Sequence, residues 1–186
     1  MRLLLATRNA HKLRELARLL GGLELDPLPD GVDLPPETGE TYADNALIKA
    51  RAAAQATGRA AVADDSGIEA EALDWAPGVR TARYAGPEAT DEENLARLRA
   101  EVPAGSRLRY VCVIAHVDPS GEETLFRGAC EGTMAAARAG EGGFGYDPVF
   151  VPDGRSRTMA ELSDGEKDSI SHRGNAARAL GEWLRP

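Results

Sequence analysis

The adjacent aspartates Asp64 and Asp65 are the residues of this sequence best suited to chemistry. They follow the apolar residues 61–63, which indicate a buried strand ending at the two carboxylates. Successive strand residues point to opposite faces, and paired carboxylates at such an end are costly unless a cation neutralises them. Mg²⁺ binds carboxylate oxygens and commonly shares its site with phosphates. The pair therefore indicates a divalent-cation site, and the alternative is a solvated Asp-Ser-Gly turn.

Lysines mark places where a polyanion could bind. The chain is rich in arginine, and its only lysines are Lys12, Lys49 and Lys167. Lysine carries a compact point charge, whereas the guanidinium of arginine is a planar fork, so the two are not interchangeable. The presence of a few lysines in an arginine-rich chain therefore indicates that they make specific contacts. Lys12 follows a strand-to-helix turn, which is a natural phosphate seat, although no Walker loop occurs. Lys49 lies one predicted helical turn after Asn45, and an ordinary solvated helix face is the alternative.

Two later segments favour a flat, acceptor-rich ligand. Phe144 lies between two glycines, which suits the close approach of a stacked base, and a hairpin whose Phe fills the core is the alternative. Lys167, His172 and Arg173 bring basic side chains to the start of the last predicted helix, where positive charge opposes the helix dipole. A ligand with negative charge or hydrogen-bond acceptors would explain that arrangement, although a lone histidine is more often structural.

The elements that position these residues follow from periodicity and capping patterns. Strands are predicted at residues 2–7, 23–28, 107–117, 123–131 and 149–151, besides the strand that carries Asp64. Helices are predicted after residues 8–10, at about 41–57, from the Thr90 capping box to about 101, and from Ser171 onward with Trp183 facing inward. Strands and helices alternate early and a hairpin follows, which predicts an α/β fold with a mixed β-sheet flanked by helices.

Bulk properties limit the class of protein. The 186 residues predict one domain, 1–186, and the net charge of −8 argues against nucleic-acid binding. No apolar run reaches membrane-spanning length, so no membrane association is expected. Cys112 and Cys130 lie in separate apolar stretches and are predicted to be reduced core residues. These properties suit a cytoplasmic enzyme.

Short motifs occur in a characteristic order over nearly the whole chain. They are Thr7-Arg8-Asn9, Glu37-Thr38-Gly39, Asp44-Asn45-Ala46, Ala63-Asp64-Asp65-Ser66-Gly67, Ala76-Pro77-Gly78, Thr81-Ala82-Arg83-Tyr84, Gly143-Phe144-Gly145-Tyr146-Asp147-Pro148 and Ser171-His172-Arg173-Gly174. Together they closely resemble the inosine/xanthosine triphosphate pyrophosphatases. The resemblance implies Mg²⁺-dependent hydrolysis of ITP, dITP and XTP to the monophosphate and pyrophosphate, usually by a homodimer. It also implies an elongated mixed sheet with two lobes and a central substrate cleft.

The resemblance implies a role for each matching residue. Asp65 would be the catalytic base and a metal ligand, with Asp64 as a further ligand. The substrate contacts would be Thr7, Arg8, Asn9, Ala10, His11, Lys12 and Ser66, with Phe144, Gly145, Tyr146, Asp147, Lys167, His172 and Arg173 holding the nucleoside. Two departures matter: Arg8 replaces a common glycine, and Pro36 replaces a common metal-binding glutamate, which makes its neighbour Glu37 a candidate ligand.

Two other functions stay open on the sequence. One is a related pyrophosphatase acting on modified pyrimidine triphosphates, and the other is a nucleotide-binding sensor without turnover. The intact aspartate pair together with all three lysines favours an enzyme, because a pure binder does not need an activated water. The basic group formed by Lys167, His172 and Arg173 supplies mostly hydrogen-bond donors, which predicts a preference for a 6-oxo purine over adenine.

Overall fold

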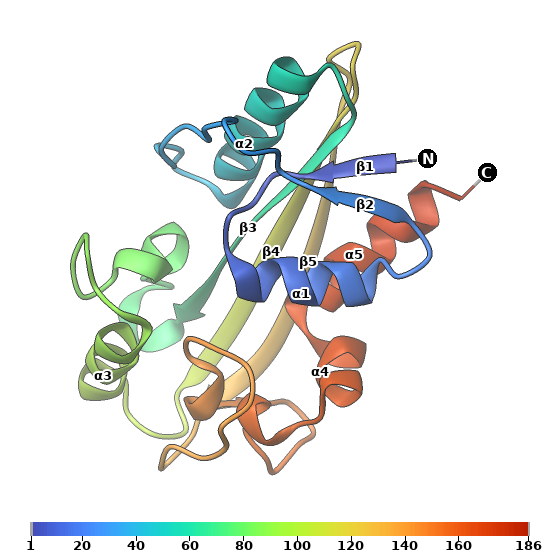
Figure 1. Cartoon of the computed structure of the whole chain (residues 1–186). Helices are drawn as coiled ribbons and strands as arrows, with labels where there is room; N and C mark the ends of the chain where they lie inside the picture. The colour runs from blue at the N-terminus through green and yellow to red at the C-terminus, as the bar shows by residue number, and fades with distance from the viewer. Residues whose placement is uncertain (1, 186) are drawn as a thin grey trace. The chain divides into compact units, whose positions relative to one another are not determined.

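A computed structural model describes residues 2–185 of the chain and contains a six-stranded mixed sheet (Figure 1). The strands are β1 (Arg2–Leu5), β2 (Glu24–Pro27), β3 (Ala61–Ala70), β4 (Arg107–Val117), β5 (Glu123–Met134) and β6 (Phe150–Pro152), in the order β2-β1-β3-β4-β5-β6. β1 pairs in parallel with β2 and β3, whereas β5 and β6 are antiparallel. The predicted mixed α/β architecture is confirmed.

Helices begin where capping residues predict them. They are α1 (Ala10–Leu19), α2 (Tyr42–Thr57), α3 (Asp91–Glu101), α4 (Asp164–Ile170) and α5 (His172–Trp183). Thr41 and Thr90 form capping boxes at α2 and α3, and Gly58 ends α2 in the left-handed conformation. The short helix α4, capped by Ser163, was not predicted because it has too few apolar residues to show a helical period.

The chain divides into two compact units, and two of the boundaries fall within the predicted site residues. Within the described part, the first unit contains residues 2–65, 112–128 and 173–185, and the second contains residues 66–111 and 129–172. Asp65 and Ser66 therefore belong to different units, as do His172 and Arg173. The prediction of one domain over residues 1–186 stays a prediction.

The first unit has an apolar cluster on each face of its strands. One cluster joins the strands to α1 and α5, and the other joins them to α2. Leu3 and Val62 belong to the first cluster, and Leu4 and Ala63 belong to the second. Because strand side chains alternate, Asp64 continues the α1–α5 face and Asp65 continues the α2 face. The alternation thus sends the two carboxylates in opposite directions.

The second unit is built around its own apolar cluster. Leu95 and Leu98 of α3 pack with Tyr110 of β4 and Phe150 of β6. The Tyr110 and Phe150 rings lie 4.5 Å apart at a tilt of 42°. Both cysteines are free and buried, as predicted.

Two local predictions are wrong. β3 does not end at the aspartates but continues to Ala70, because its later N–H groups find partners: Ile68 donates to Thr81 Oγ1 at 2.9 Å and Ala70 donates to the Ala76 carbonyl at 3.0 Å. Trp183 does not face inward but is 48% exposed, and the centroid of its ring lies 5.6 Å from that of Phe126 at a tilt of 56°.

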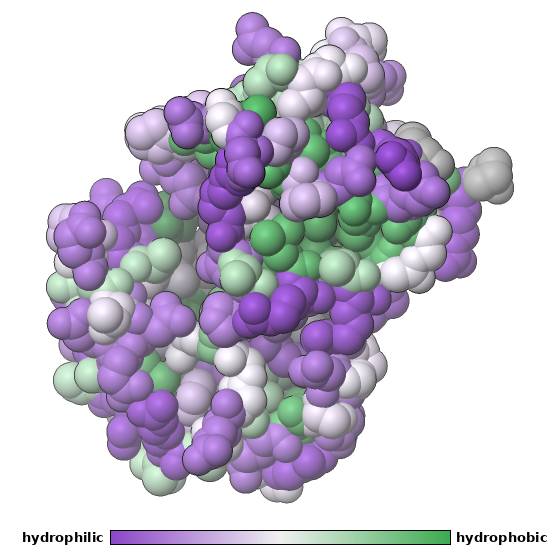
Figure 2. All heavy atoms as spheres, in the orientation of Figure 1, coloured by the Kyte–Doolittle hydropathy of each residue, from purple (hydrophilic) through white to green (hydrophobic). Residues whose placement is uncertain are grey.

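Hydrophilic side chains cover most of the face seen in Figure 2. In the described part of the chain, none of the helices has the length and apolar content required to span a membrane.

Candidate active site

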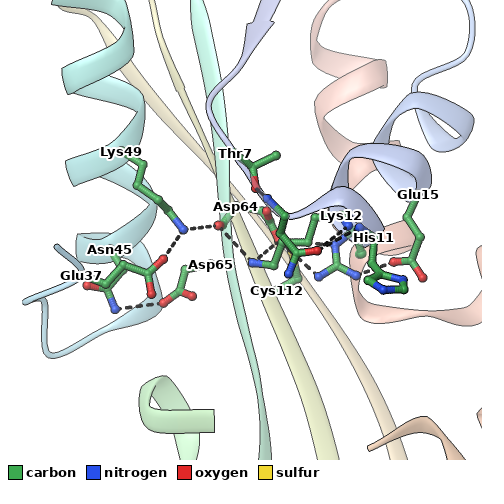
Figure 3. A network of polar contacts seen from close by, with 12 residues as sticks. Thr7, His11, Lys12, Glu15, Glu37, Asn45, Lys49, Asp64, Asp65 and Cys112 are labelled. Atoms are coloured by element: carbon green, nitrogen blue, oxygen red, sulfur yellow. Dashed lines mark hydrogen bonds and ion pairs between the residues drawn. The ribbon is translucent and has the colours of Figure 1, made fainter. Parts of the chain in front are cut away.

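Asp64 is an ionised carboxylate surrounded by cations. Its Oδ2 lies 3.0 Å from Lys12 Nζ (Figure 3). The same oxygen lies 3.2 Å from Arg173 Nη2, and the Asp64 side chain is fully buried. Burial alone would raise the pKa of this carboxyl, but the charges of Lys12, Arg173 and Lys49 outweigh burial and hold the pKa well below its usual range. Cys112 lies against the same carboxylate, and burial and the Asp64 charge raise the pKa of its thiol to about 12.

Arg173 belongs to this cluster in the first unit, whereas the other residues implied to hold the nucleoside belong to the second unit. Its guanidinium is 2% exposed, donates to Glu15 Oε2 at 2.5 Å, and donates to Asp64 Oδ2 through Nε and Nη2 at 3.3 and 3.2 Å. The resemblance implied that Arg173 contacts the nucleoside, and its positive charge at a helix start predicted a ligand with negative charge or hydrogen-bond acceptors. The protein supplies that anion itself, through Glu15 and Asp64.

Asp65 faces α2, on the opposite side of β3. It is 5% exposed and accepts a hydrogen bond from Asn45 Nδ2 at 3.0 Å (Figure 3). Burial raises the pKa of Asp65, and the charge of Glu37 raises it further, so that together they outweigh the opposing effect of Lys12 and Lys49. The two neighbouring aspartates therefore differ in the direction of their pKa shifts.

Lys49 connects the surroundings of the two aspartates. Its Nζ donates to the main-chain carbonyl of Asp64 at 2.7 Å and binds the Glu37 carboxylate. Burial lowers the pKa of Lys49, but Asp64 and Glu37 more than compensate, and the net shift is upward. Glu37 was a candidate metal ligand on the sequence only because it is next to Pro36. In the structure it lies beside Lys49 and near enough to Asp65 to influence the pKa of Asp65.

The loop that carries Glu37 is held at both ends. At one end, the Arg8 guanidinium donates to the carbonyls of Leu28, Pro29 and Val32 at 3.0, 2.8 and 3.0 Å. At the other end, the Gly39 N–H donates to Asn45 Oδ1 at 2.8 Å, and a Cβ on Gly39 would lie 2.4 Å from the Asp44 Cβ. Arg8, predicted to contact the triphosphate, has its guanidinium on this loop.

The turn before α1 satisfies part of its own hydrogen-bonding capacity. Asn9 Oδ1 accepts from the N–H groups of His11 and Lys12 at 2.9 and 3.2 Å, and Thr7 Oγ1 accepts from the Asn9 N–H at 3.2 Å. Two of the main-chain donors expected to face a phosphate are therefore capped by a side chain. Asn9, Ala10 and His11 are exposed, whereas Thr7 is buried.

Asp147 organises the candidate base-binding residues of the second unit. Its Oδ2 accepts from Lys167 Nζ at 2.7 Å and from the Phe144 N–H at 3.1 Å, and its Oδ1 accepts from the Tyr110 hydroxyl at 3.1 Å. Gly143 has a φ of +70°, and a Cβ there would lie 2.0 Å from Asp147 Oδ2. Only glycine therefore allows this loop to close on the carboxylate.

The rings of this second group are oriented by neighbours. Lys167 Nζ lies 5.2 Å from the centroid of the Phe144 ring. The buried His172 ring stacks on Tyr110 with centroids 4.5 Å apart and an interplanar angle of 9°. The Tyr146 hydroxyl donates to the Thr81 carbonyl at 2.8 Å, which uses its polar group inside the fold. The half-buried Ser66 and Gly145 belong to the same unit, where the Gly145 N–H donates to Asp91 Oδ2 at 3.2 Å.

The predicted site residues thus gather in two groups, one in each unit. The first-unit group contains Thr7, Arg8, Asn9, Ala10, His11, Lys12, Glu37, Lys49, Asp64, Asp65 and Arg173, and the second-unit group contains Ser66, Phe144, Gly145, Tyr146, Asp147, Lys167 and His172. Sequence reasoning missed Glu15 and Tyr110. Glu15 lies three residues after Lys12 on α1 and next to the buried Leu16, and that position was its one visible indication. Tyr110 is indistinguishable from a core residue of a buried strand.

The donors around Asp65 fit a hard divalent cation. Among residues 2–185, no three His, Cys, Asp or Glu side chains converge as a complete metal site. Mg²⁺, however, commonly binds through one or two carboxylates and takes its other ligands from water and phosphates. Asp65 and Glu37 provide two such carboxylates. Asp64 Oδ1 is buried, and within the described residues it has no hydrogen-bond partner.

The charge balance of the first-unit group also favours a cation. Around the two aspartates there are three cations and four carboxylates, counting the aspartates themselves. The cations are Lys12, Lys49 and Arg173, and the carboxylates are Glu15, Glu37, Asp64 and Asp65. An excess negative charge repels a polyphosphate, and a bound divalent cation reverses its sign.

Comparison with known proteins gives consistent matches over the full chain. The model of the Ham1 family matches residues 3–183. The dITP/XTP pyrophosphatase of Mycobacteroides abscessus is 47% identical, with 100% of this chain and 95% of that protein covered. The dITP/XTP pyrophosphatase of Frankia alni is 48% identical, with 100% and 98% covered.

Solved structures agree with these sequence matches. The structure of a HAM1 protein from Coxiella burnetii matches with a TM-score of 0.87 and 41% identity, covering 99% of this chain and 98% of that one. A family model that spans nearly the whole chain, together with full-length relatives and a shared fold, leads to one conclusion: this chain belongs to the Ham1 family.

Proposed function

We propose that this protein hydrolyses the non-standard purine nucleoside triphosphates ITP, dITP and XTP to the nucleoside monophosphate and pyrophosphate. Its full-length relatives carry the name dITP/XTP pyrophosphatase. The observation that carries the proposal is the aspartate pair on β3, in which Asp64 is saturated by cations while burial and Glu37 raise the pKa of Asp65.

Asp65 is the catalytic base in this proposal. A general base works best when its pKa approaches the working pH, and the surroundings of Asp65 shift its pKa in that direction. Asp65 takes a proton from water, and the water oxygen forms a bond to the α-phosphorus. The bond between the α-phosphorus and the bridging oxygen breaks, so pyrophosphate leaves with that oxygen. Asn45, which donates to Asp65 Oδ2, orients the carboxylate.

The same carboxylate contributes to a proposed Mg²⁺ site. Asp65 would hold the ion, with Glu37 as a further donor and with water and phosphate oxygens completing the coordination. Asp64, which the resemblance also implied as a ligand, points to the other face of β3 and is proposed to hold Lys12 and Arg173 instead. A bound divalent cation polarises phosphoryl oxygens and neutralises their charge during phosphoryl transfer. The excess of carboxylates over cations in this group supports the assignment.

Lys12 and Lys49 are the proposed triphosphate contacts. Each ammonium has three donors, and each already contacts Asp64, at Oδ2 for Lys12 and at the main-chain carbonyl for Lys49. Asp64 therefore keeps two cations close together, where they can offset the charge that develops on departing pyrophosphate. Arg173 completes this arrangement by holding Asp64 from the side of α5.

Lys167 and Phe144 are the proposed base contacts. Phe144 is half-buried on a glycine-rich loop, and its ring offers a stacking surface. Lys167 donates to Asp147, and its ammonium is the donor proposed to face the 6-oxo acceptor of hypoxanthine or xanthine, whereas the 6-amino group of adenine presents a donor. We propose the homodimer as the active form and the cytoplasm as its location.

Product analysis with Mg²⁺ across a panel of nucleotides tests the proposed function. The panel contains ITP, dITP, XTP, ATP, GTP and modified pyrimidine triphosphates. We expect pyrophosphate and the monophosphate from ITP, dITP and XTP, released in one step. Orthophosphate release through a diphosphate intermediate would contradict the proposal. Tight ITP binding without any product would favour a sensor, and faster turnover of the pyrimidines would favour the related pyrophosphatase.

A further inference from the structure

We infer that Tyr110 is a positioning residue that sets purine specificity through the Asp147–Lys167 pair and His172. The inference rests on the proposed function, because it assumes that Lys167 and His172 serve the base. Tyr110 has no place in the motifs that indicate the family, and it is 6% exposed on β4. It contacts Asp147 through a hydrogen bond and His172 through ring stacking.

The hydroxyl of Tyr110 fixes one oxygen of Asp147. It donates to Oδ1 at 3.1 Å, while Oδ2 accepts from Lys167 Nζ at 2.7 Å and from the Phe144 N–H at 3.1 Å. A carboxylate held at both oxygens cannot rotate about its terminal torsion without losing one set of bonds. The Tyr110 hydroxyl therefore fixes the orientation in which Asp147 binds the Lys167 ammonium and the Phe144 N–H.

The ring of Tyr110 fixes His172. The two rings are stacked, with centroids 4.5 Å apart and planes within 9° of parallel. On another side, Phe150 packs against Tyr110 at 4.5 Å with a tilt of 42°, so the Tyr110 ring is itself held by the core of the second unit. His172 is buried, and the stack restricts its ring plane.

Tyr110 thus orients the ammonium of Lys167, through Asp147, and the ring of His172, through stacking. Discrimination between a 6-oxo and a 6-amino purine depends on donors placed within tenths of an ångström of the acceptor, because hydrogen bonds weaken steeply with poor geometry. Loss of the Tyr110 hydroxyl leaves the apolar ring in place and frees the Asp147 carboxylate to turn. The expected result is a loss of base selectivity rather than a loss of the catalytic step.

The variant Tyr110→Phe tests this inference. It preserves the ring and its stack on His172 and removes only the hydroxyl. We expect the ratio of kcat/KM for ITP to kcat/KM for ATP to fall about 10-fold, in keeping with a weakened charge-assisted hydrogen-bond network. The KM for ITP should rise while kcat at saturating ITP stays within about twofold of wild type. Tyr84→Phe is the matched control, because its hydroxyl binds Glu101 rather than Asp147, and it should leave the ratio unchanged.

A double-mutant cycle with Lys167→Met separates positioning from packing. If Tyr110 acts through Lys167, Tyr110→Phe should not change the ITP/ATP ratio further in the Lys167→Met background. An equal, independent loss in both backgrounds, or an unchanged ratio in Tyr110→Phe alone, would overturn the inference. Should Tyr110→Phe fail to fold, Asp147→Asn removes the carboxylate charge that binds both Tyr110 and Lys167. An unchanged ITP/ATP ratio in that variant would also overturn the inference.

Failure of the proposed function gives a different result. Wild-type protein would then release no pyrophosphate from ITP, and the specificity role of Tyr110 would fall with it. The contact itself has an independent readout in the amide resonance of Phe144, whose N–H donates to Asp147. A shift of that resonance in Tyr110→Phe, with no shift in Tyr84→Phe, supports the link. An unmoved resonance would contradict it.

Discussion

Asp64 and Asp65 are chemically identical neighbours, yet the two faces of β3 give them different surroundings. On the α1–α5 face, Asp64 meets Lys12 and Arg173, and their charges hold its pKa below the usual range despite complete burial. On the α2 face, Asp65 meets Asn45 and the charge of Glu37, and burial raises its pKa. The two surroundings differ because adjacent residues of a strand point to opposite faces of the sheet.

The difference indicates which carboxylate can take part in chemistry. A carboxylate saturated by cations is a weak base, because protonation would leave those cations buried and uncompensated. A buried carboxylate with an anion beside it gains from accepting a proton or a metal ion. We therefore treat Asp64 as the residue that holds the cations and Asp65 as the proposed base.

The largest expected effect is on the activity of Asp65→Asn. This change preserves shape while removing the base, and general base catalysis alone contributes about 10²–10⁴ in rate. kcat for ITP should fall by at least that factor. The free energy of unfolding should stay the same or rise, because an Asp with a raised pKa costs stability when it ionises. Near-normal kcat at saturating Mg²⁺ would refute the role of Asp65.

The next effect is on the stability of Asp64→Asn. Removing one partner of a buried ion pair costs about 3–5 kcal/mol, because Arg173 and Lys12 lose their shared anion. Denaturant unfolding of both asparagine variants measures the contrast directly. Loss of stability in Asp65→Asn, with none in Asp64→Asn, would reverse the comparison. Ser171→Ala, at a buried site outside this ion cluster, is a control for general sensitivity of the fold.

The pH dependence of unfolding sharpens the same contrast. The pKa of Asp64 is lowered in the folded state, so its stabilisation is present above the ordinary carboxyl pKa of about 4 and is lost as the pH falls. Wild-type protein should therefore lose stability on acidification, and Asp64→Asn should lose less over the same interval. Parallel curves for the two proteins would show that Asp64 does not contribute this acid sensitivity.

A smaller effect is expected from Arg8→Ala. Arg8 binds three carbonyls at the start of the loop that carries Glu37, so its loss should loosen one donor of the proposed metal site. We expect the Mg²⁺ concentration for half-maximal activity to rise about fivefold, corresponding to about 1 kcal/mol. Arg51→Ala, which breaks an exposed ion pair with Glu123, is the matched control. Equal effects in both variants would remove the special role of Arg8.

Sequence patterns predicted the parts of this molecule that depend on near neighbours. Alternation correctly separated Asp64 from Asp65, and capping residues located α2 and α3. Partners distant in sequence were the difficulty. Arg173 reaches Asp64 across 109 positions, and Tyr110 reaches Asp147 across 37, so neither pair shows in any local period. Trp183 has the spacing of a core residue but lies at the end of α5, where too few neighbours remain to cover it.

Hydrolysis of ITP in ¹⁸O-labelled water tests the central claim most directly, because it identifies the phosphorus atom that the activated water attacks. If Asp65 activates water beside the α-phosphorus, a single turnover should place the label in inosine monophosphate and leave pyrophosphate unlabelled. Label in pyrophosphate or orthophosphate would mean that the water attacks the β- or γ-phosphorus. That result would contradict the assignment of the Asp65 face of β3 to the α-phosphate.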